Sequence, residues 1–214
     1  MTDKIKNLIF DLGGVVITID YDQAVRAFES IGLKNARKWL DPYTQGGIFG
    51  DVERGTISGE EFRKRLGEVI GREMTWDECR KGWQGYLKDV PQRNLEALIR
   101  LRKAGYRLIL LSNTNPFMME WAFSDAFDGK GHSINDYFDT CYVSYKCKFL
   151  KPDKNFFRYV LDNENIKAEE SLFIDDGPRN TAAAQEIGLH TMCPENGSDW
   201  TKDLFQLLEI GNNQ

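Results

Sequence analysis

The feature that most constrains the fold of this chain is an apolar run over residues 8–10 that ends in a carboxylate, Asp11, and is followed by Gly13 and Gly14. A continuous apolar run of this kind is typical of a strand covered on both faces, as in a parallel sheet. The glycines permit a tight turn just beyond it. Because ligands of open α/β sheets bind beyond the carboxyl ends of strands, Asp11 is a candidate functional residue. On this segment alone, a turn former or a helix N-cap explains Asp11 equally well.

Two further apolar runs, over residues 108–111 and 172–174, also end in polar side chains. The polar residues that follow are Ser112 and Asn113 in the first case and Asp175 and Asp176 in the second. If the three runs are neighbouring parallel strands, these groups meet at one edge of the sheet. Taken singly, each has a simpler explanation, since Ser112 is also a good helix N-cap and residues 175–177 also suit a solvated turn.

Lys151, next to Pro152, lies between the second and third runs. In this order the four segments resemble the four motifs of the haloacid dehalogenase superfamily of phosphohydrolases. The Phe-Asp-Leu-Gly of residues 10–13 and the Leu-Ser-Asn-Thr-Asn of residues 111–115 are similar to a sugar-phosphate phosphatase subgroup. That subgroup is typified by α-D-glucose-1-phosphate phosphatase and is related to the N-terminal phosphatase domain of epoxide hydrolase. The resemblance covers nearly the whole chain and implies an α/β fold, with a Rossmann-like parallel sheet core and an inserted helical cap.

The length of 214 residues allows a full α/β core and one smaller accessory unit. A net charge of -5 and a pI of about 5.2 provide no general basic surface, so we expect neither nucleic acid nor an anionic membrane as a partner. No run approaches the ~20 apolar residues of a membrane helix, and the N-terminus is polar. We therefore expect a soluble, cytoplasmic protein. The sequence does not predict its oligomeric state.

The four cysteines show no Cys-x-x-Cys spacing, and the chain has two histidines. A zinc site is therefore not expected, and we interpret the cysteines as reduced thiols.

Residues 21–90 show several helical patterns and no long β-branched run. Asp22 is a candidate N-cap, residues 50–55 are predicted to form a loop, and capping boxes are expected at Ser58 with Glu61 and at Thr75 with Glu78. By resemblance, this block is the cap, giving a catalytic core of residues 1–20 and 91–214 and a cap of residues 21–90. A short hairpin or flap over residues 15–19 is expected between them.

From Pro91 onwards, strands and helices alternate. The predicted strands cover residues 106–111, 137–144, 172–174 and 189–193. The predicted helices lie around residues 95–101, 156–161, 181–187 and 204–208, and residues 117–131 are predicted to form a helix followed by an exposed loop.

A carboxylate at the position of Asp11 is suited to attack phosphorus and form an aspartyl-phosphate. Asp175 and Asp176 would bring more negative charge close to it, and a hard divalent ion such as Mg²⁺ would relieve that repulsion while neutralising phosphate oxygens. The resemblance implies that the Asp11 carboxylate, the main-chain carbonyl of Gly13 and Asp176 hold the ion. Asp175 would be a direct or water-bridged partner, and Asn180 would orient the cluster from behind.

The resemblance also implies that Ser112 and Asn113 donate hydrogen bonds to the phosphoryl oxygens while Lys151 balances their charge. The simpler interpretation of Lys151 is a surface lysine.

Gly13 departs from the common family pattern, which has a second aspartate here that protonates the leaving oxygen. A glycine has no proton to give, although its carbonyl can still bind a metal. Either the enzyme acts on esters with good leaving groups, such as a sugar 1-phosphate, or another residue donates; Asp20 is our candidate. The resembled subgroup shares this glycine.

The sequence thus favours a Mg²⁺-dependent phosphatase for a small phosphorylated metabolite, in particular a sugar phosphate such as a hexose 1-phosphate. One alternative is a hydrolytic 2-haloacid dehalogenase, which also lacks the second aspartate but needs no metal, so that the Asp175-Asp176 pair argues against it. The other is a non-catalytic phospholigand-binding protein, against which the intact nucleophile and lysine argue.

Overall fold

The computed structural model describes residues 5–41 and 45–210, and its centre is a five-stranded sheet of order β5-β4-β1-β6-β7. Every pairing in this sheet is parallel. The strands are β1 (Asn7–Phe10), β4 (Arg107–Ser112), β5 (Thr140–Val143), β6 (Ser171–Ile174) and β7 (His190–Met192). The predicted α/β parallel-sheet fold is confirmed. The predicted core and cap segments also include residues 1–4, 42–44 and 211–214, which lie outside the described residues.

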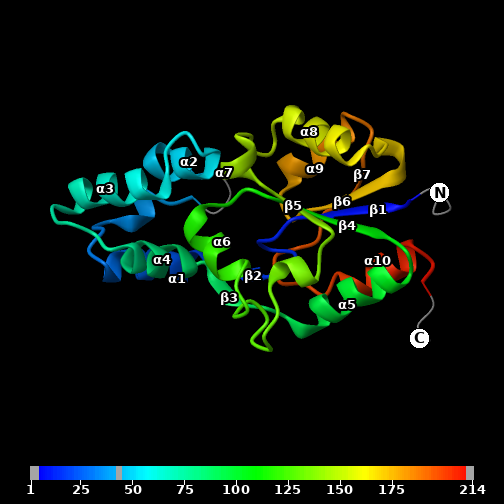
Figure 1. The fold of residues 1–214 in the computed structure, drawn as a ribbon, viewed down its shortest axis with the longest axis horizontal. Helices are drawn as coiled ribbons and strands as arrows, with labels where there is room; N and C mark the ends of the chain where they lie inside the picture. The colour runs from blue at the N-terminus through cyan, green and yellow to red at the C-terminus, as the bar shows by residue number, and fades with distance from the viewer. Residues whose placement is uncertain (1–4, 42–44, 211–214) are drawn as a thin grey trace.

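Successive side chains of each strand point to opposite faces of the sheet, so each face builds its own hydrophobic layer. Ile9, Ile109 and Phe173 pack on the face covered by α8 (Lys154–Glu164) and α9 (Pro178–Gln185). Their strand neighbours Phe10 and Leu110 pack on the other face, against α5 (Gln92–Lys103) and α10 (Thr201–Leu207). Figure 1 shows these two helical layers above and below the sheet.

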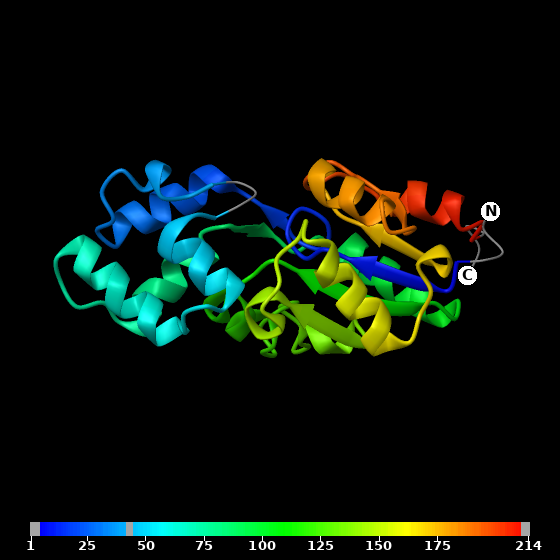
Figure 2. The same cartoon turned by 90° about the horizontal axis from the view of Figure 1, so that it is seen from above.

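The central strand β1 lies between β4 and β6, with Phe10 in register with Leu110 and Ile174. The residues that follow these three strands therefore emerge side by side, as the sequence predicted. Figure 2 shows the strands pointing toward a separate helical lobe, so their carboxyl ends face it.

The helical lobe has its own aromatic core. Its elements are α1 (Tyr21–Ser30), the 3-10 helix η2 (Ala36–Lys38), α2 (Gly47–Arg54), α3 (Gly59–Ile70) and α4 (Trp76–Gln84). Phe28, Phe49, Phe62 and Trp83 are all buried and pack edge-on or tilted against one another. Phe117, from α6 (Pro116–Ala122) of the other lobe, joins this cluster.

Two short strands connect the lobes. β2 (Thr18–Ile19) pairs antiparallel with β3 (Leu87–Asp89), so the chain enters and leaves the helical lobe through one two-stranded ribbon. Of the predicted hairpin or flap over residues 15–19, only Thr18 and Ile19 form a strand, and its partner comes from beyond the helical lobe, while residues 15 and 16 form a turn. The remaining short helices are η3 (Ile134–Asp136), α7 (Ser144–Cys147) and η4 (Ala168–Glu170).

Helix capping differs from the prediction at two places. Asp20, not Asp22, caps α1, because its Oδ1 accepts a hydrogen bond from the backbone N–H of Gln23 at 2.8 Å. Ser58 caps α3 as expected, but Glu61 pairs with Arg65 at 2.7 Å instead of completing a capping box. The capping box of Thr75 and Glu78 is confirmed.

The prediction of a loop over residues 50–55 was wrong. Residues 50–54 belong to α2, which ends at Gly55 in a left-handed conformation. Gly46 starts α2 without a side-chain cap, and Gly50 lies so close to the preceding turn that an added Cβ would fall 2.3 Å from the carbonyl oxygen of Gln45. These glycines hide the helix in the sequence, since they remove its start signal and lower its intrinsic propensity.

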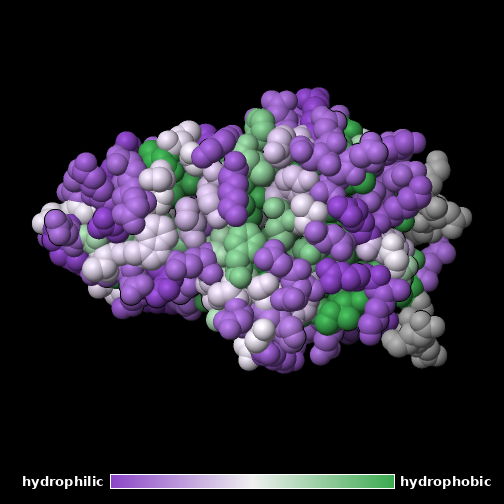
Figure 3. All heavy atoms as spheres, viewed as in Figure 1, coloured by the Kyte–Doolittle hydropathy of each residue, from purple (hydrophilic) through white to green (hydrophobic). Residues whose placement is uncertain are grey.

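Hydrophilic side chains cover most of the face shown in Figure 3. Within the described ranges, no helix is both long and apolar enough to cross a membrane. The four cysteines are free thiols, as expected.

Candidate active site

Asp11 is fixed just beyond the end of β1 by two main-chain contacts. Its N–H donates to the carbonyl of Ile174 in β6 at 2.9 Å, which continues the sheet ladder by one residue. Its Oδ1 accepts a hydrogen bond from the N–H of Leu12 at 2.7 Å. The predicted nucleophile is therefore held in one place at the carboxyl edge of the sheet.

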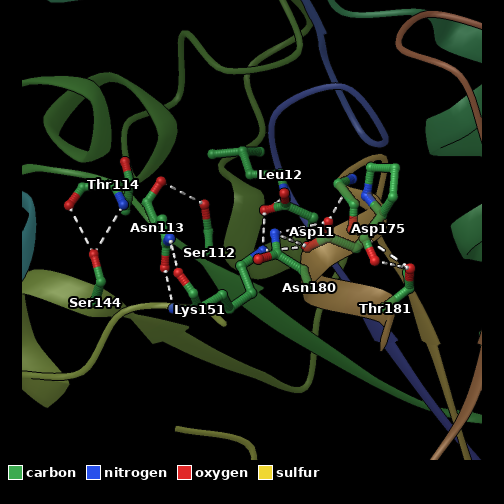
Figure 4. A network of polar contacts seen from close by, with 12 residues as sticks. Asp11, Leu12, Ser112, Asn113, Thr114, Ser144, Lys151, Asp175, Asn180 and Thr181 are labelled. Carbon is green, nitrogen blue, oxygen red and sulfur yellow. Dashed lines mark hydrogen bonds and ion pairs between the residues drawn. The ribbon is translucent and has the colours of Figure 1, made fainter. Parts of the chain in front are cut away.

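Lys151 is a buried cation between two carboxylates, not a surface lysine. Its side chain is 1% exposed, and Nζ lies 2.9 Å from Oδ1 of Asp11 and 2.6 Å from Oδ2 of Asp175. Asn113 positions it: the Asn113 side chain accepts from the N–H of Lys151 at 2.8 Å and donates to its carbonyl at 2.9 Å. Figure 4 shows the lysine reaching from this clamp to the acidic residues.

Asp175 is fully buried, and the protein satisfies both of its oxygens. Oδ1 accepts hydrogen bonds from the N–H of Gly177 at 2.8 Å and from Nδ2 of Asn180 at 2.9 Å, while Oδ2 binds Lys151. Asn180 therefore orients Asp175 directly. Residues 175–177 are therefore a largely buried loop held by hydrogen bonds, and not the solvated turn that was the simpler interpretation.

Asp11, Asp175 and Asp176 form the acidic cluster in the described part of the chain that could hold a metal ion. Each contributes one carboxylate oxygen, and these oxygens lie within 4.8 Å of one another. Gly13, whose carbonyl was predicted to complete the site, lines the same cavity as Asp11 and Asp176. Three carboxylate groups thus lie around one ammonium group, that of Lys151.

The titration of these groups reflects that crowding. Burial raises the pKa of Asp11, and Asp175 and Asp176 add to the rise, while Lys151 opposes it. Burial and then Asp175 raise the pKa of Asp176 to about 6. Burial lowers the pKa of Lys151, but Asp11 and Asp175 outweigh it, so that the net shift is upward and the ammonium form is stabilised. One ammonium does not neutralise three carboxylates, and a hard divalent cation fits the remaining charge and the all-oxygen donor set.

Ser112 lies buried at the end of β4. The loop that follows Ser112 is held in place by Ser144, the first residue after β5. The hydroxyl of Ser144 accepts from the N–H of Thr114 at 2.9 Å and donates to its carbonyl at 3.0 Å. Asn115, not Ser112, caps α6. This leaves Ser112 free of the capping role that was its simpler explanation. The sequence analysis did not single out Ser144.

A cavity of about 570 Å³ lies over these groups and extends to the helical lobe. From the sheet edge it is lined by Asp11, Gly13, Ser112, Asn113, Lys151, Asp176 and Asn180, among others. From the helical lobe it is lined by Asp41, Gln45, Glu53, Trp83 and Tyr86. Asp20, our candidate proton donor, is not among the described residues that line it.

The sequence analysis missed the residues of the helical lobe that face this cavity. Glu53 fell in a segment predicted as a loop, and Trp83 was one of several aromatic residues with the spacing of a helix core. No local pattern distinguishes them, because their common position depends on how the lobe folds over the sheet.

Known proteins are similar to this chain over nearly its full length. Residues 5–188 match the family model described as haloacid dehalogenase-like hydrolase. The chain is 44% identical over 204 residues to D-ribitol-5-phosphate phosphatase of Bacteroides thetaiotaomicron, which covers 95% of this chain and 98% of that protein.

Solved structures give the same picture. A HAD-like family hydrolase from Porphyromonas gingivalis superposes with a TM-score of 0.92 at 38% identity, covering 97% of this chain and all of that one (100%). A HAD family enzyme from Bacteroides thetaiotaomicron, solved as a mutant with magnesium and inorganic phosphate, superposes with a TM-score of 0.88 at 35% identity, covering 94% and 98% of the two chains.

Proposed function

The chain belongs to the haloacid dehalogenase-like hydrolase family, and from this premise we propose that it is a Mg²⁺-dependent phosphatase for a small sugar or polyol phosphate. The observation that carries the proposal is the meeting of Asp11, Asp175 and Asp176 around one buried lysine at the floor of a cavity. The named phosphatase relative and the structure solved with magnesium and phosphate support it.

Asp11, Asp176 and the carbonyl of Gly13 are the groups that we propose hold Mg²⁺. Because both oxygens of Asp175 already accept hydrogen bonds from the protein, Asp175 would act mainly by orienting Lys151 or through a bridging water. When bound, the ion supplies positive charge that neutralises phosphate oxygens.

Asp11 is the proposed nucleophile. Its carboxylate oxygen attacks phosphorus, the bond between phosphorus and the ester oxygen breaks, and the ester oxygen takes a proton from solvent water and leaves as the alcohol. Water then attacks the aspartyl-phosphate, the bond between phosphorus and the Asp11 oxygen breaks, and inorganic phosphate leaves. Ser112 and Lys151 would bind the phosphoryl oxygens through both steps, with Asn113 holding the lysine in place.

We further propose that residues 21–90 form a cap over a catalytic core of residues 1–20 and 91–214. The two-stranded ribbon of β2 and β3 is the covalent link between the lobes, and such a link suits a lid that opens for substrate and closes to exclude water.

Two substrate classes have specific support. The 44% identical relative is named for D-ribitol 5-phosphate, which favours a polyol phosphate. Gly13 favours a hexose 1-phosphate, because an anomeric oxygen is a better leaving group and needs less protonation. We place the polyol phosphate first, because the relative matches the whole chain, including the helical lobe that lines the cavity.

A screen of phosphate release from polyol phosphates, hexose 1- and 6-phosphates, nucleotides and phosphoamino acids, with and without Mg²⁺, tests the proposal. We expect hydrolysis of a polyol or sugar phosphate that requires Mg²⁺. Release of halide from a 2-haloacid without metal would favour the dehalogenase instead, and tight binding of phosphate esters without turnover would favour the non-catalytic alternative.

A further inference from the structure

Glu53 of α2 carries a carboxyl group in the cavity that has no partner among the described residues. It lines the same cavity as Asp11, yet no described residue makes a hydrogen bond or ion pair with its side chain. Burial raises its pKa from the ordinary 4.5 to about 8, so its neutral form dominates at neutral pH. The Glu53 side chain is half-buried, and a neutral carboxyl group at the cavity wall can both donate and accept hydrogen bonds.

Trp83 supplies a second unpaired group on the same side. Its ring lines the cavity and is locked by tilted or edge-on contacts with Phe28, Phe49 and Phe62. Its indole N–H is buried and donates to no acceptor in the described structure. Buried indole N–H groups normally have a partner, so this donor is an unsatisfied polar group in a residue that lines the cavity.

The other polar groups nearby are already engaged. Gln45 donates to the hydroxyl of Tyr86 at 3.0 Å, and that hydroxyl contacts the carbonyl of Asp41 at 3.4 Å. Glu53 and the indole N–H of Trp83 are therefore the two polar groups that the helical lobe brings to the cavity lining without a partner among the described residues.

The place of Glu53 relative to the sheet edge is set by a close contact two residues further on. A Cβ at Gly55 would lie 2.1 Å from the carbonyl oxygen of Tyr145, and Lys148 donates through Nζ to the carbonyl of Gly55. This contact joins the end of α2 to α7 of the core. Glu53 is consequently held over the cavity by the core itself, at a defined distance from the phosphate end.

We infer that Glu53, assisted by the indole N–H of Trp83, is a specificity residue that binds hydroxyl groups on the organic part of the phosphate ester. The inference rests on the proposed function, which places the phosphate at the acidic cluster, and it deepens that function by selecting a polyhydroxylated chain over an apolar or cationic one. A neutral carboxyl group suits hydroxyls better than ammonium groups, since it carries no charge to attract a cation.

The test compares ribitol 5-phosphate with pentyl phosphate, which has the same chain length and no other hydroxyl groups. Steady-state kinetics are measured for wild type, Glu53→Leu, Glu53→Gln and the matched control Glu68→Gln, which changes an exposed glutamate of the same lobe. We expect Glu53→Leu to lower kcat/KM for ribitol 5-phosphate about tenfold or more, mainly through KM, and to leave pentyl phosphate unchanged or improved. Glu53→Gln should retain part of the preference, because an amide still bonds hydroxyls, and Glu68→Gln should retain all of it.

Equal losses on both esters in Glu53→Leu would overturn the inference, as would a selective loss on an amine-bearing ester such as phosphoethanolamine. A loss in kcat that grows as the leaving group becomes poorer would also overturn it, because Glu53 would then be a proton donor.

Calorimetric binding of the two esters to Asp11→Asn and to Asp11→Asn/Glu53→Leu, both with Mg²⁺, separates this inference from the proposed function. Without wild-type turnover, a Glu53-dependent preference in binding would support the hydroxyl site while the phosphatase assignment fails. Wild-type turnover without any Glu53-dependent preference in binding would support the phosphatase assignment and rule out the hydroxyl site.

Discussion

Asp176 lies directly against Gly14: a Cβ added at Gly14 would fall 2.1 Å from Oδ2 of Asp176. Gly14 also has a φ of +79°, a backbone conformation that side chains other than glycine adopt at a cost. The glycine after β1 thus makes room for the carboxylate after β6. Positions 14 and 176, which are 162 residues apart in the chain, can approach this closely only because residue 14 has no Cβ.

We therefore predict that Gly14→Ala weakens Mg²⁺ binding. The clash displaces Asp176, and disturbing the surroundings of a metal ligand typically costs 10–100-fold in affinity. A Mg²⁺ titration of phosphatase activity measures the shift. Gly71→Ala is the control, because Gly71 has a similar φ of +86° but no atom within 4 Å of an added Cβ. An unchanged Mg²⁺ requirement in Gly14→Ala would show that the Asp176 position does not govern metal binding.

Lys151→Met should both inactivate and destabilise the protein. It removes the ammonium that lies between two carboxylates, and breaking a buried ion pair costs about 3–5 kcal/mol. Thermal unfolding with and without Mg²⁺ checks this, and Mg²⁺ should recover part of the loss by neutralising the carboxylates. Lys154→Met, which removes a half-exposed partner of Glu186, should cost no more than about 1 kcal/mol. A melting temperature of Lys151→Met equal to that of the control would contradict the buried pair.

Gly13→Asp should restore the missing general acid. Backbone strain does not oppose this change, because the φ of Gly13 lies outside the left-handed region and an added Cβ would make an ordinary 3.4 Å contact with Ile19. We expect a gain of up to about 10²–10⁴-fold on simple alkyl phosphates and a smaller gain on aryl phosphates, whose leaving groups need less protonation. Leaving-group dependence for wild type, Gly13→Asp and Gly13→Ala measures it. Parallel profiles for all three proteins would exclude a protonation role at this position.

Glu53 should make the free energy of unfolding decrease as the pH rises. Its carboxyl group ionises near 4.5 in the unfolded chain and near 8 when folded, so the unfolded state loses the proton first. Wild-type stability should therefore decrease as pH rises from about 4.5 to about 8. Glu53→Gln lacks this decrease. The melting temperature of Glu53→Gln minus that of wild type should therefore be a few degrees larger at pH 9 than at pH 5. A constant difference between the two proteins across this pH range would contradict the raised pKa of Glu53 in the folded state.

The sheet and its edge were predictable from the sequence, because local patterns determine them. Buried parallel strands read as continuous apolar runs, and the residues after β1, β4 and β6 necessarily emerge together once those strands are neighbours. The same reasoning brought Asp11, Asp175 and Asp176 into one expected site before their distances were known, whereas Lys151 was placed there by the family resemblance.

The helical lobe was harder to predict, because its functional side chains depend on tertiary packing. Glycines concealed α2, and with it Glu53. Asn113 was predicted as a phosphate ligand, and its side chain also binds the main chain of Lys151, a contact between segments 38 residues apart that the sequence did not indicate. Asp20 was the candidate acid because the short flap before it could fold it over the site, but its side chain caps α1. Position along the chain does not specify which of these polar groups faces the cavity.

Asp11 is expected to attack phosphorus with the help of a divalent ion held by its neighbouring carboxylates. Phosphate release from ribitol 5-phosphate by wild type and by Asp11→Asn, each with Mg²⁺ and with excess chelator, tests it most directly. We predict turnover by wild type with Mg²⁺, and a fall of about 10³-fold or more both in Asp11→Asn and in chelator, with Asp11→Asn still folded. Turnover by Asp11→Asn within a few-fold of wild type, or full wild-type activity in chelator, would contradict the account.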